Sequence, residues 1–276
     1  MVVVLVVALV LSSGGGVALP ALAADDPGVQ PQVVGGTPVP DGKYPFVAAL
    51  LDTRFGSTPT EQQFCTGTLI DRNSVLTAAH CVVGTSPQPL RIVLGRTVLS
   101  KSDQGQERSV SAIFIDPSYN GKRSDAYDAA VLELNDSVSA IAPIKLAALN
   151  QNFLEKPGHR VKIAGWGKTG SGYPERMHEA SLPVVSDTYA RKVYGRLFVP
   201  ALMVAAGETG VDTCVGDSGG PAFAQTPGGP RQIGITSFGG ARCGARDQPG
   251  VYTEVNASSI RNFITSMAKR RSGALP

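Results

Sequence analysis

Short apolar stretches recur along this chain after residue 32, and clusters of Gly, Pro, Asn or Asp separate them. Glycine and proline are both plentiful, at 32 and 20 residues of 276. So many backbone breakers favour short strands joined by turns over long helices. The pattern lacks the helical segments that a covered parallel sheet needs between its strands. We therefore predict an all-β barrel or sandwich. The expected strands are Phe46–Leu51, Gly67–Ile70, Ile92–Leu94, Val110–Ile115, Ala129–Leu134, Val161–Ala164, Ala222–Ala224, Ile233–Thr236 and Val251–Val255.

The C-terminal segment has a different period. Ile260, Phe263, Ile264 and Met267 follow helical spacing after Asn256. This spacing predicts one amphipathic helix that packs on the β structure and ends in a frayed basic tail.

The N-terminus indicates export. Residues 2–11 are all apolar, and the small residues of Ala21-Leu22-Ala23 follow at the spacing of a signal peptidase site. The alternative is a membrane anchor, but crossing a bilayer needs about 20 apolar residues. We therefore expect residues 1–23 to be a signal peptide and the protein to be secreted, without stable membrane association.

Charge and cysteine content limit the possible ligands. The net charge is only +3 and the basic residues are scattered, so no nucleic-acid partner is expected. An exported chain can form disulfides, and four cysteines allow three pairings among which spacing does not choose. The chain has no Cys-x-x-Cys motif, so zinc is disfavoured, and we expect neither a metal site nor a cofactor.

Three motifs stand far apart in the sequence: Leu76-Thr77-Ala78-Ala79-His80-Cys81, Asp128-Ala129-Ala130-Val131-Leu132 and Asp212-Thr213-Cys214-Val215-Gly216-Asp217-Ser218-Gly219-Gly220-Pro221. With them the chain resembles the trypsin-like serine proteases, especially bacterial secreted members. The resemblance runs from Val33-Val34-Gly35-Gly36 to the C-terminal helix. It includes Gly165-Trp166-Gly167, Ser237-Phe238-Gly239 and Pro249-Gly250-Val251-Tyr252.

The resemblance implies a catalytic triad. Ser218 would attack the substrate, His80 would act as general base and then acid, and Asp128 would orient His80. Asp125 is the rival carboxylate, but only Asp128 is followed by four apolar residues, as a buried strand requires. Taken alone, Ser218 would be interpreted as a turn residue and His80 as a structural histidine. The other two histidines, His159 and His178, are interpreted as surface residues.

The resemblance also implies the substrate contacts. The N–H groups of Gly216 and Ser218 would bind the oxyanion. Asp212 would lie at the floor of the primary pocket and select Arg or Lys. The remaining pocket residues implied are Ser237, Gly239 and Gly250, the two glycines forming the walls.

The implied disulfides are Cys65–Cys81 and Cys214–Cys243. Some positions depart from the family pattern. Ala190 and Ala205 stand where bacterial relatives place another disulfide, and Phe238 stands where a Trp is usual. Arg96 follows Leu94-Gly95 where the calcium loop of vertebrate trypsins has Glu, so we expect no calcium there.

By resemblance, the fold is two six-stranded antiparallel β-barrels with a C-terminal α-helix. The barrels would span residues 33–139 and 140–276, the latter including the helix and basic tail. Residues 24–32 would form a short pro-segment. Cleavage at Gln32–Val33 would free the Val33 α-amino group to pair with Asp217. Gln32 does not suit a pocket floored by Asp212, so we expect a separate activating protease. The alternative is that the Val33 segment is only the start of a strand.

The expected activity is peptide-bond hydrolysis after Arg or Lys by a monomer. The expected partners are protein or peptide substrates and protein inhibitors of proteases. Two alternatives stay open: an inactive protease-fold binding protein and a protease with another substrate range.

Overall fold

The computed structural model describes residues 35–121 and 125–268. The expected signal peptide and pro-segment, Val33 and the expected basic tail therefore lie outside the described residues.

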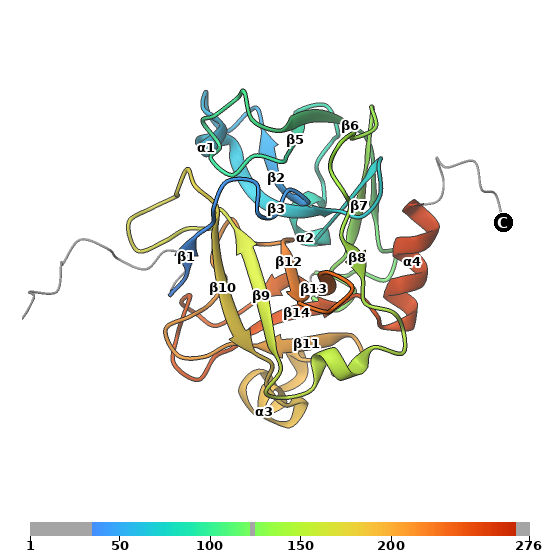
Figure 1. The fold of residues 1–276 in the computed structure, drawn as a ribbon. Helices are drawn as coiled ribbons and strands as arrows, with labels where there is room; N and C mark the ends of the chain where they lie inside the picture. Colours follow the sequence, from blue (N-terminus) through green and yellow to red (C-terminus); the bar gives the residue numbers. More distant parts are fainter. Residues whose placement is uncertain (1–34, 122–124, 269–276) are drawn as a thin grey trace, which may run out of the picture.

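Six strands in the first half of the chain close into a barrel (Figure 1). They are four to ten residues long, and loops or short helices connect most of them. In order around the barrel they are β2 (Val47–Asp52), β3 (Gln63–Leu69), β4 (Ser74–Thr77), β7 (Ala130–Leu134), β6 (Gln106–Ile115) and β5 (Leu90–Leu94), which pairs with β2 again.

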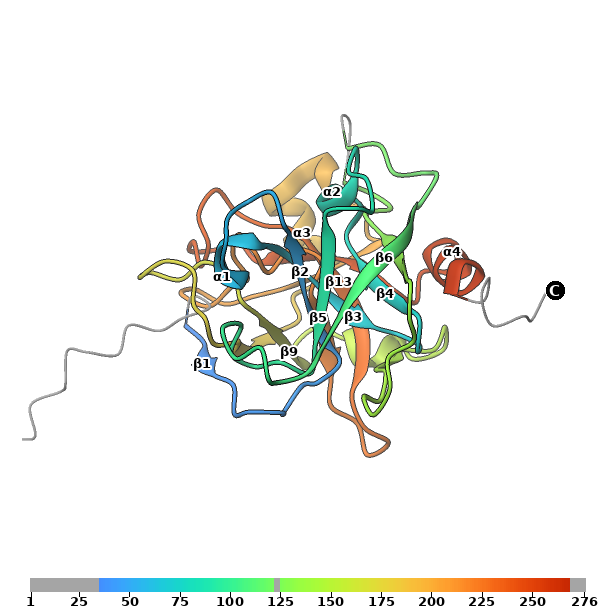
Figure 2. The same ribbon diagram turned by 90° about the horizontal axis from the view of Figure 1, so that it is seen from above.

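Seven strands from the second half of the chain, together with β1 from the N-terminal part, form an eight-stranded sheet beside the barrel (Figures 1 and 2). Its main path is β1 (Thr37–Pro38), β10 (His178–Pro183), β9 (Arg160–Gly165), β12 (Pro221–Ala224), β13 (Arg231–Phe238), β14 (Gly250–Glu254) and β11 (Met203–Ala206), with β8 (Lys145–Leu146) parallel to β13. Just beyond β10, Val184 bridges to Ala206 and the Val185 N–H donates to the Ala205 carbonyl over 2.9 Å. These contacts bring the end of β10, near one edge of the sheet, next to β11 at the other edge.

Helices are few and short, except at the C-terminus. They are α1 (Pro59–Gln62), α2 (Ala79–Val82), α3 (Asp187–Tyr194) and α4 (Ser258–Ala268), with 3₁₀ turns at η1 (Asn152–Glu155) and η2 (Gly195–Leu197). The expected C-terminal helix is α4, whose Ile260 and Ile264 are buried against the barrel residue Val131 and its neighbours. No helix in the described ranges is long and apolar enough to cross a membrane.

One of the apolar clusters spans the barrel and the sheet. Phe223 of β12 packs edge-on against Tyr44 and Phe46, with ring centroids 5.2 and 5.7 Å apart. Fully buried aromatic rings of this kind contribute strongly to packing energy. The contact fixes β12 against the barrel, and the segments that precede β12 and follow β4 meet at this junction.

Candidate active site

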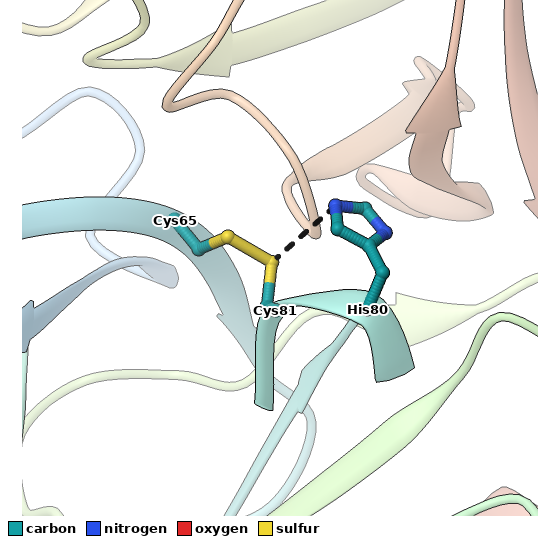
Figure 3. Close-up of side chains that lie close together, drawn as sticks. All are labelled: Cys65, His80 and Cys81. Atoms are coloured by element: carbon teal, nitrogen blue, oxygen red, sulfur yellow. Dashed lines mark hydrogen bonds between the residues drawn. A yellow bond between two sulfur atoms is a disulfide. The ribbon is translucent and has the colours of Figure 1, made fainter. Parts of the chain in front are cut away.

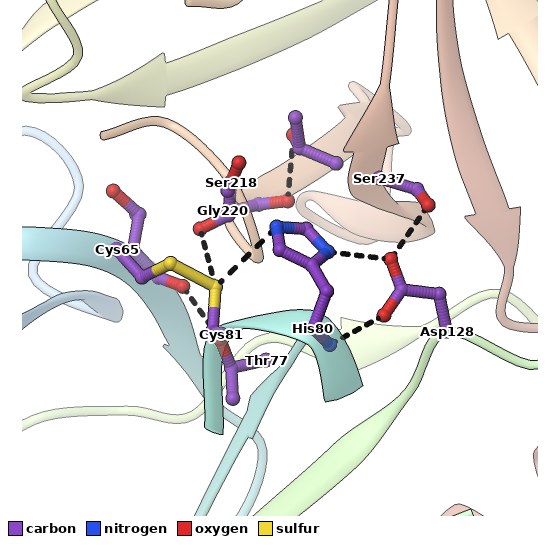
Figure 4. Close-up of polar contacts among 10 residues, drawn as sticks. Cys65, Thr77, His80, Cys81, Asp128, Ser218, Gly220 and Ser237 are labelled. Atoms are coloured by element: carbon purple, nitrogen blue, oxygen red, sulfur yellow. Dashed lines mark hydrogen bonds and ion pairs between the residues drawn. A yellow bond between two sulfur atoms is a disulfide. The ribbon is translucent and has the colours of Figure 1, made fainter. Parts of the chain in front are cut away.

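His80 lies on α2, the short helix that follows β4 at the junction of barrel and sheet. Its main-chain N–H donates to Oδ1 of Asp128 over 2.9 Å, and its Nδ1 lies 2.7 Å from Oδ2 (Figure 4). Two contacts with one carboxylate fix both the backbone and the ring of His80. They leave Nε2 directed toward the segment that carries Ser218.

Asp128 comes directly before β7 and is fully buried, at 0% exposure. The preceding Tyr127 has a φ of 60°, a region that non-glycine residues rarely adopt and that is common at functional sites. Besides His80, Asp128 accepts a hydrogen bond of 2.6 Å from the Ser237 hydroxyl. Hydrogen bonds of this kind stabilise a buried carboxylate in its charged form. Asp125, the rival carboxylate, makes no hydrogen bond to His80 in the described part of the chain.

The two carboxylates act on the protonation of His80. Burial alone would lower the pKa of the imidazole, but the hydrogen bond and charge of Asp128, with the charge of Asp125, outweigh it. The pKa of His80 is therefore raised above its ordinary value. An imidazole tuned in this way can take up a proton near neutral pH and release it again.

A disulfide holds the His80 segment beside Ser218. Cys65 of β3 is bonded to Cys81, the residue after His80 (Figure 3). The Cys81 sulfur lies 3.8 Å from Nε2 of His80 and 3.6 Å from the carbonyl oxygen of Ser218. Cys65, His80 and Cys81 place their ligand atoms within 4.8 Å of one another, but sulfurs joined in a disulfide are not the thiolates that bind zinc.

The loop before β12 presents two N–H groups beside the Ser218 side chain. Gly216 has a φ of 101°, which glycine adopts without strain. Within the described ranges, the main-chain N–H groups of Gly216 and Ser218 donate to no other group. Neighbouring free N–H groups form a site for a negatively charged oxygen.

A cavity of about 170 Å³ opens beside Ser218. Asp212 lines it, is 3% exposed, and accepts hydrogen bonds from the N–H groups of Thr213 and Gly244. Burial raises the pKa of Asp212 to about 6 despite these bonds. Ser237 and Gly239 also line the cavity. Gly250, expected as the other wall, is not among the residues that line this cavity, but a Cβ there would lie only 2.9 Å from Asp212 Oδ1, so a larger residue would displace that carboxylate.

Asp217 is the second buried carboxylate of this loop, at 3% exposure. It accepts hydrogen bonds from the N–H groups of Gly167 and Cys214 over 2.8 and 3.0 Å. Burial raises its pKa to about 6. Its expected partner Val33 lies outside the described residues.

The structure thus gathers the residues that the sequence singled out. His80, Asp128 and Ser237 form one hydrogen-bonded chain, Ser218 lies next to it, and Asp212 lies in the adjoining cavity. The four cysteines pair as Cys65–Cys81 and Cys214–Cys243.

Some features were not foreseen. Ser237, expected only in the pocket, also anchors Asp128. Gln63 and Thr66 reach the Ser218 loop from β3, and no sequence signal marked them. The interpretation of His178 as a surface residue is wrong: it is 2% exposed, because β10 lies inside the second sheet.

A buried carboxylate, a histidine and a serine beside free N–H groups, on a two-part β fold, are the arrangement of a serine hydrolase with a general base. Comparisons with known proteins make the class specific. The family model described as Trypsin matches residues 33–264. The chain therefore belongs to the trypsin family and is a trypsin-like serine endopeptidase.

Individual relatives cover most of the chain. A trypsin from Saccharopolyspora erythraea is 40% identical over 229 residues, 82% of this chain and 94% of that protein. Chymotrypsin-like elastase family member 1 from Bos taurus is 36% identical, over 88% of this chain and 93% of that protein. Human serine protease 56 is 36% identical over 81% of this chain, which spans only 37% of that longer protein. Because relatives named trypsin and elastase both match, membership alone does not fix the primary specificity.

Proposed function

We propose that this protein cleaves peptide bonds after Arg or Lys through an acyl-enzyme on Ser218. His80 accepts the Ser218 proton as general base and later donates it to the leaving amine. Asp128 orients His80 and stabilises the imidazolium, and the N–H groups of Gly216 and Ser218 bind the oxyanion. The observation that supports this reaction best is the 2.7 Å contact between His80 Nδ1 and the fully buried Asp128.

The proposed specificity rests on Asp212. Its carboxylate lies in a narrow cavity beside Ser218 and has only neutral N–H and hydroxyl donors among the described residues. A long cationic side chain would pair with it, whereas a neutral side chain would leave a charge buried and unpaired. Gly239 and Gly250 leave room for such a side chain to enter.

Acylation can be tested directly. The purified mature enzyme, mixed rapidly with an arginine ester that deacylates slowly, should give a burst of one alcohol per enzyme. Mass spectrometry should then find the acyl group on the peptide that contains Ser218. Acyl transfer to another residue, or no burst with an active enzyme, would refute the assignment.

We also propose that the enzyme is secreted as a zymogen. Signal cleavage after Ala23 and removal of residues 24–32 by another protease would give a mature chain that starts at Val33. Its α-amino group would pair with Asp217, a buried carboxylate that otherwise has only main-chain donors among the described residues. Two disulfides fit an oxidising compartment. The position of Gly35 supports a chain that runs inward toward Asp217. A Cβ at Gly35 would lie 2.5 Å from the Gly210 carbonyl oxygen, so the chain passes close to the pocket loop.

The proposed organisation follows the same division. Residues 33–139 and 140–276 would form two barrels, the second closed by the contacts between Val184 and the end of β11. Strand β1 belongs to the first segment in sequence but pairs with β10 of the second. We expect a monomer that acts on protein substrates and is bound by protein inhibitors of proteases.

A further inference from the structure

The oxyanion loop, residues 215–218, contains three consecutive peptide units, and the carbonyl of each unit accepts a hydrogen bond. The Val215 carbonyl accepts the Lys168 N–H over 2.6 Å. The Asp217 carbonyl accepts the Gly220 N–H over 2.9 Å. Because the carbonyl and N–H of a trans peptide point in opposite directions, these two bonds aim the N–H groups of Gly216 and Ser218.

The middle peptide unit, between Gly216 and Asp217, decides whether those two N–H groups converge. Gly216 has no Cβ and adopts either sign of φ at little cost, so this unit could rotate if nothing held it. Its N–H donates to the Cys214 carbonyl over 2.9 Å, and its carbonyl accepts two side-chain hydrogen bonds, from Gln63 Nε2 over 2.9 Å and from Thr66 Oγ1 over 2.8 Å. Both donors belong to β3 of the barrel, not to the sheet that carries Ser218.

Both donors are themselves fixed. Gln63 is 5% exposed and also donates to the Cys65 carbonyl over 3.0 Å. Thr66 is fully buried, and its main-chain N–H donates to the Ser218 carbonyl over 2.8 Å. Thr66 thus contacts the loop on both sides of Asp217, once through its side chain and once through its backbone.

We infer that Gln63 and Thr66 are positioning residues for catalysis, which hold the Gly216 peptide so that both oxyanion N–H groups converge. The inference rests on the proposed roles of Gly216 and Ser218. The two side chains are buried and bond to main-chain carbonyls, so we expect their effect on the transition state and not on substrate binding.

Thr66→Val removes the hydroxyl and keeps the shape. We expect kcat to fall about tenfold while KM stays nearly unchanged, the loss that one buried hydrogen bond corresponds to. Thr66→Ser should restore most of kcat, and Gln63→Met should reproduce the loss. Thr68→Val is the matched control, because Thr68 is a fully buried residue of the same strand whose hydroxyl has no hydrogen-bond partner among the described residues. It should leave kcat unchanged.

A second measurement separates positioning from general stability. A peptide aldehyde adds to the Ser218 hydroxyl, which passes its proton to His80, and the carbonyl oxygen becomes an oxyanion. Benzamidine fills only the primary pocket. Thr66→Val should weaken aldehyde inhibition about tenfold and leave benzamidine inhibition unchanged. An unchanged kcat in Thr66→Val, or equal losses in Thr68→Val or for both inhibitors, would overturn the inference. An inactive wild-type enzyme, or an active Ser218→Ala variant, would instead refute the proposed function.

Discussion

Replacing Asp212 with Ser removes the negative charge from the pocket floor. Cleavage after Arg and Lys should then fall at least about thirtyfold, because truncating one partner of a buried charge pair costs about 2–5 kcal/mol. Cleavage after Phe or Leu by the same variant should change far less and serves as the internal control. Both are measured as kcat/KM on peptides that differ only at that residue. If turnover of the Arg peptide barely changes, Asp212 does not determine specificity.

Two titrations should appear in the pH dependence of kcat/KM. The base form of His80 is required, and its pKa is raised, so activity should rise with pH at a higher pH than for an ordinary histidine. The pKa of Asp212 is raised to about 6, so this carboxyl becomes neutral as the pH falls through that value.

As the pH is lowered below about 6, the ratio of kcat/KM for the Arg peptide to kcat/KM for the neutral peptide should therefore decrease, because the neutral acid no longer attracts a cation. The His80 titration affects both peptides equally and cancels in this ratio. Asp212→Ser should show a ratio that does not vary with pH. A wild-type ratio that stays constant from neutral pH down to about pH 5 would contradict the proposed role.

At the scale of elements, Arg96 organises the loop between β5 and β6. It is 5% exposed, and its guanidinium donates to the carbonyls of Leu99, Ser102 and Gln104 over 3.2, 3.4 and 3.0 Å. A cationic side chain thus fills the interior of this loop, which corresponds to the calcium loop of vertebrate trypsins.

Arg96→Lys should lower the free energy of unfolding by about 1–3 kcal/mol, because one ammonium group cannot reach three carbonyls in this geometry. Urea denaturation measures the change. Arg91→Lys is the control: Arg91 lies on the adjoining strand β5, its side chain is 35% exposed, and it should shift the midpoint little. Equal midpoints for wild type and Arg96→Lys would show that the loop does not depend on Arg96.

The apolar runs of the sequence predicted most of the strands, but not all of them, since Met203–Ala206 of β11 is also apolar and was not included. All nine expected runs overlap strands, and the helical spacing from Ile260 to Met267 falls within α4. Strands β1, β4, β8, β10 and β11 lie outside these runs and were missed. His178-Glu179-Ala180 opens β10 with two polar residues that are buried by tertiary contacts, and Glu179 is paired with Lys43, Tyr44 and Lys162. Ion pairs between distant segments leave no local pattern, so burial there could not be inferred.

The candidate site shows the same division. His80, Asp128 and Ser218 lie in sequence motifs that identify them as candidate catalytic residues. Gln63 and Thr66 act through a carbonyl 150 residues or more away in sequence, and their own neighbours give no hint of it. The small residues Ala190 and Ala205 were expected to replace a disulfide. Both are fully buried in one cluster with Phe198, Met203 and Val251, so close packing occupies that place.

At the scale of the whole molecule, the proposed switch couples the N-terminus to the loop of Ser218. The precursor with Gln32–Val33 intact should be nearly inactive, because Asp217 lacks its cationic partner. N-terminal sequencing of active enzyme should begin at Val33. Purified precursor left alone should stay inactive, since Gln32 does not suit a pocket with Asp212 at its floor. Rapid, concentration-dependent self-cleavage at Gln32 would refute the need for a second protease.

The central claim is that Ser218, His80 and Asp128 cleave chains after Arg or Lys. The most direct test is the cleavage-site profile of the mature enzyme on an unfolded protein, read by mass spectrometry beside the Ser218→Ala variant. We predict cuts almost only after Arg and Lys by the wild type, and none by a variant that unfolds at the same temperature. Cuts at apolar residues, or a folded Ser218→Ala variant that still cleaves at the wild-type rate, would contradict the account.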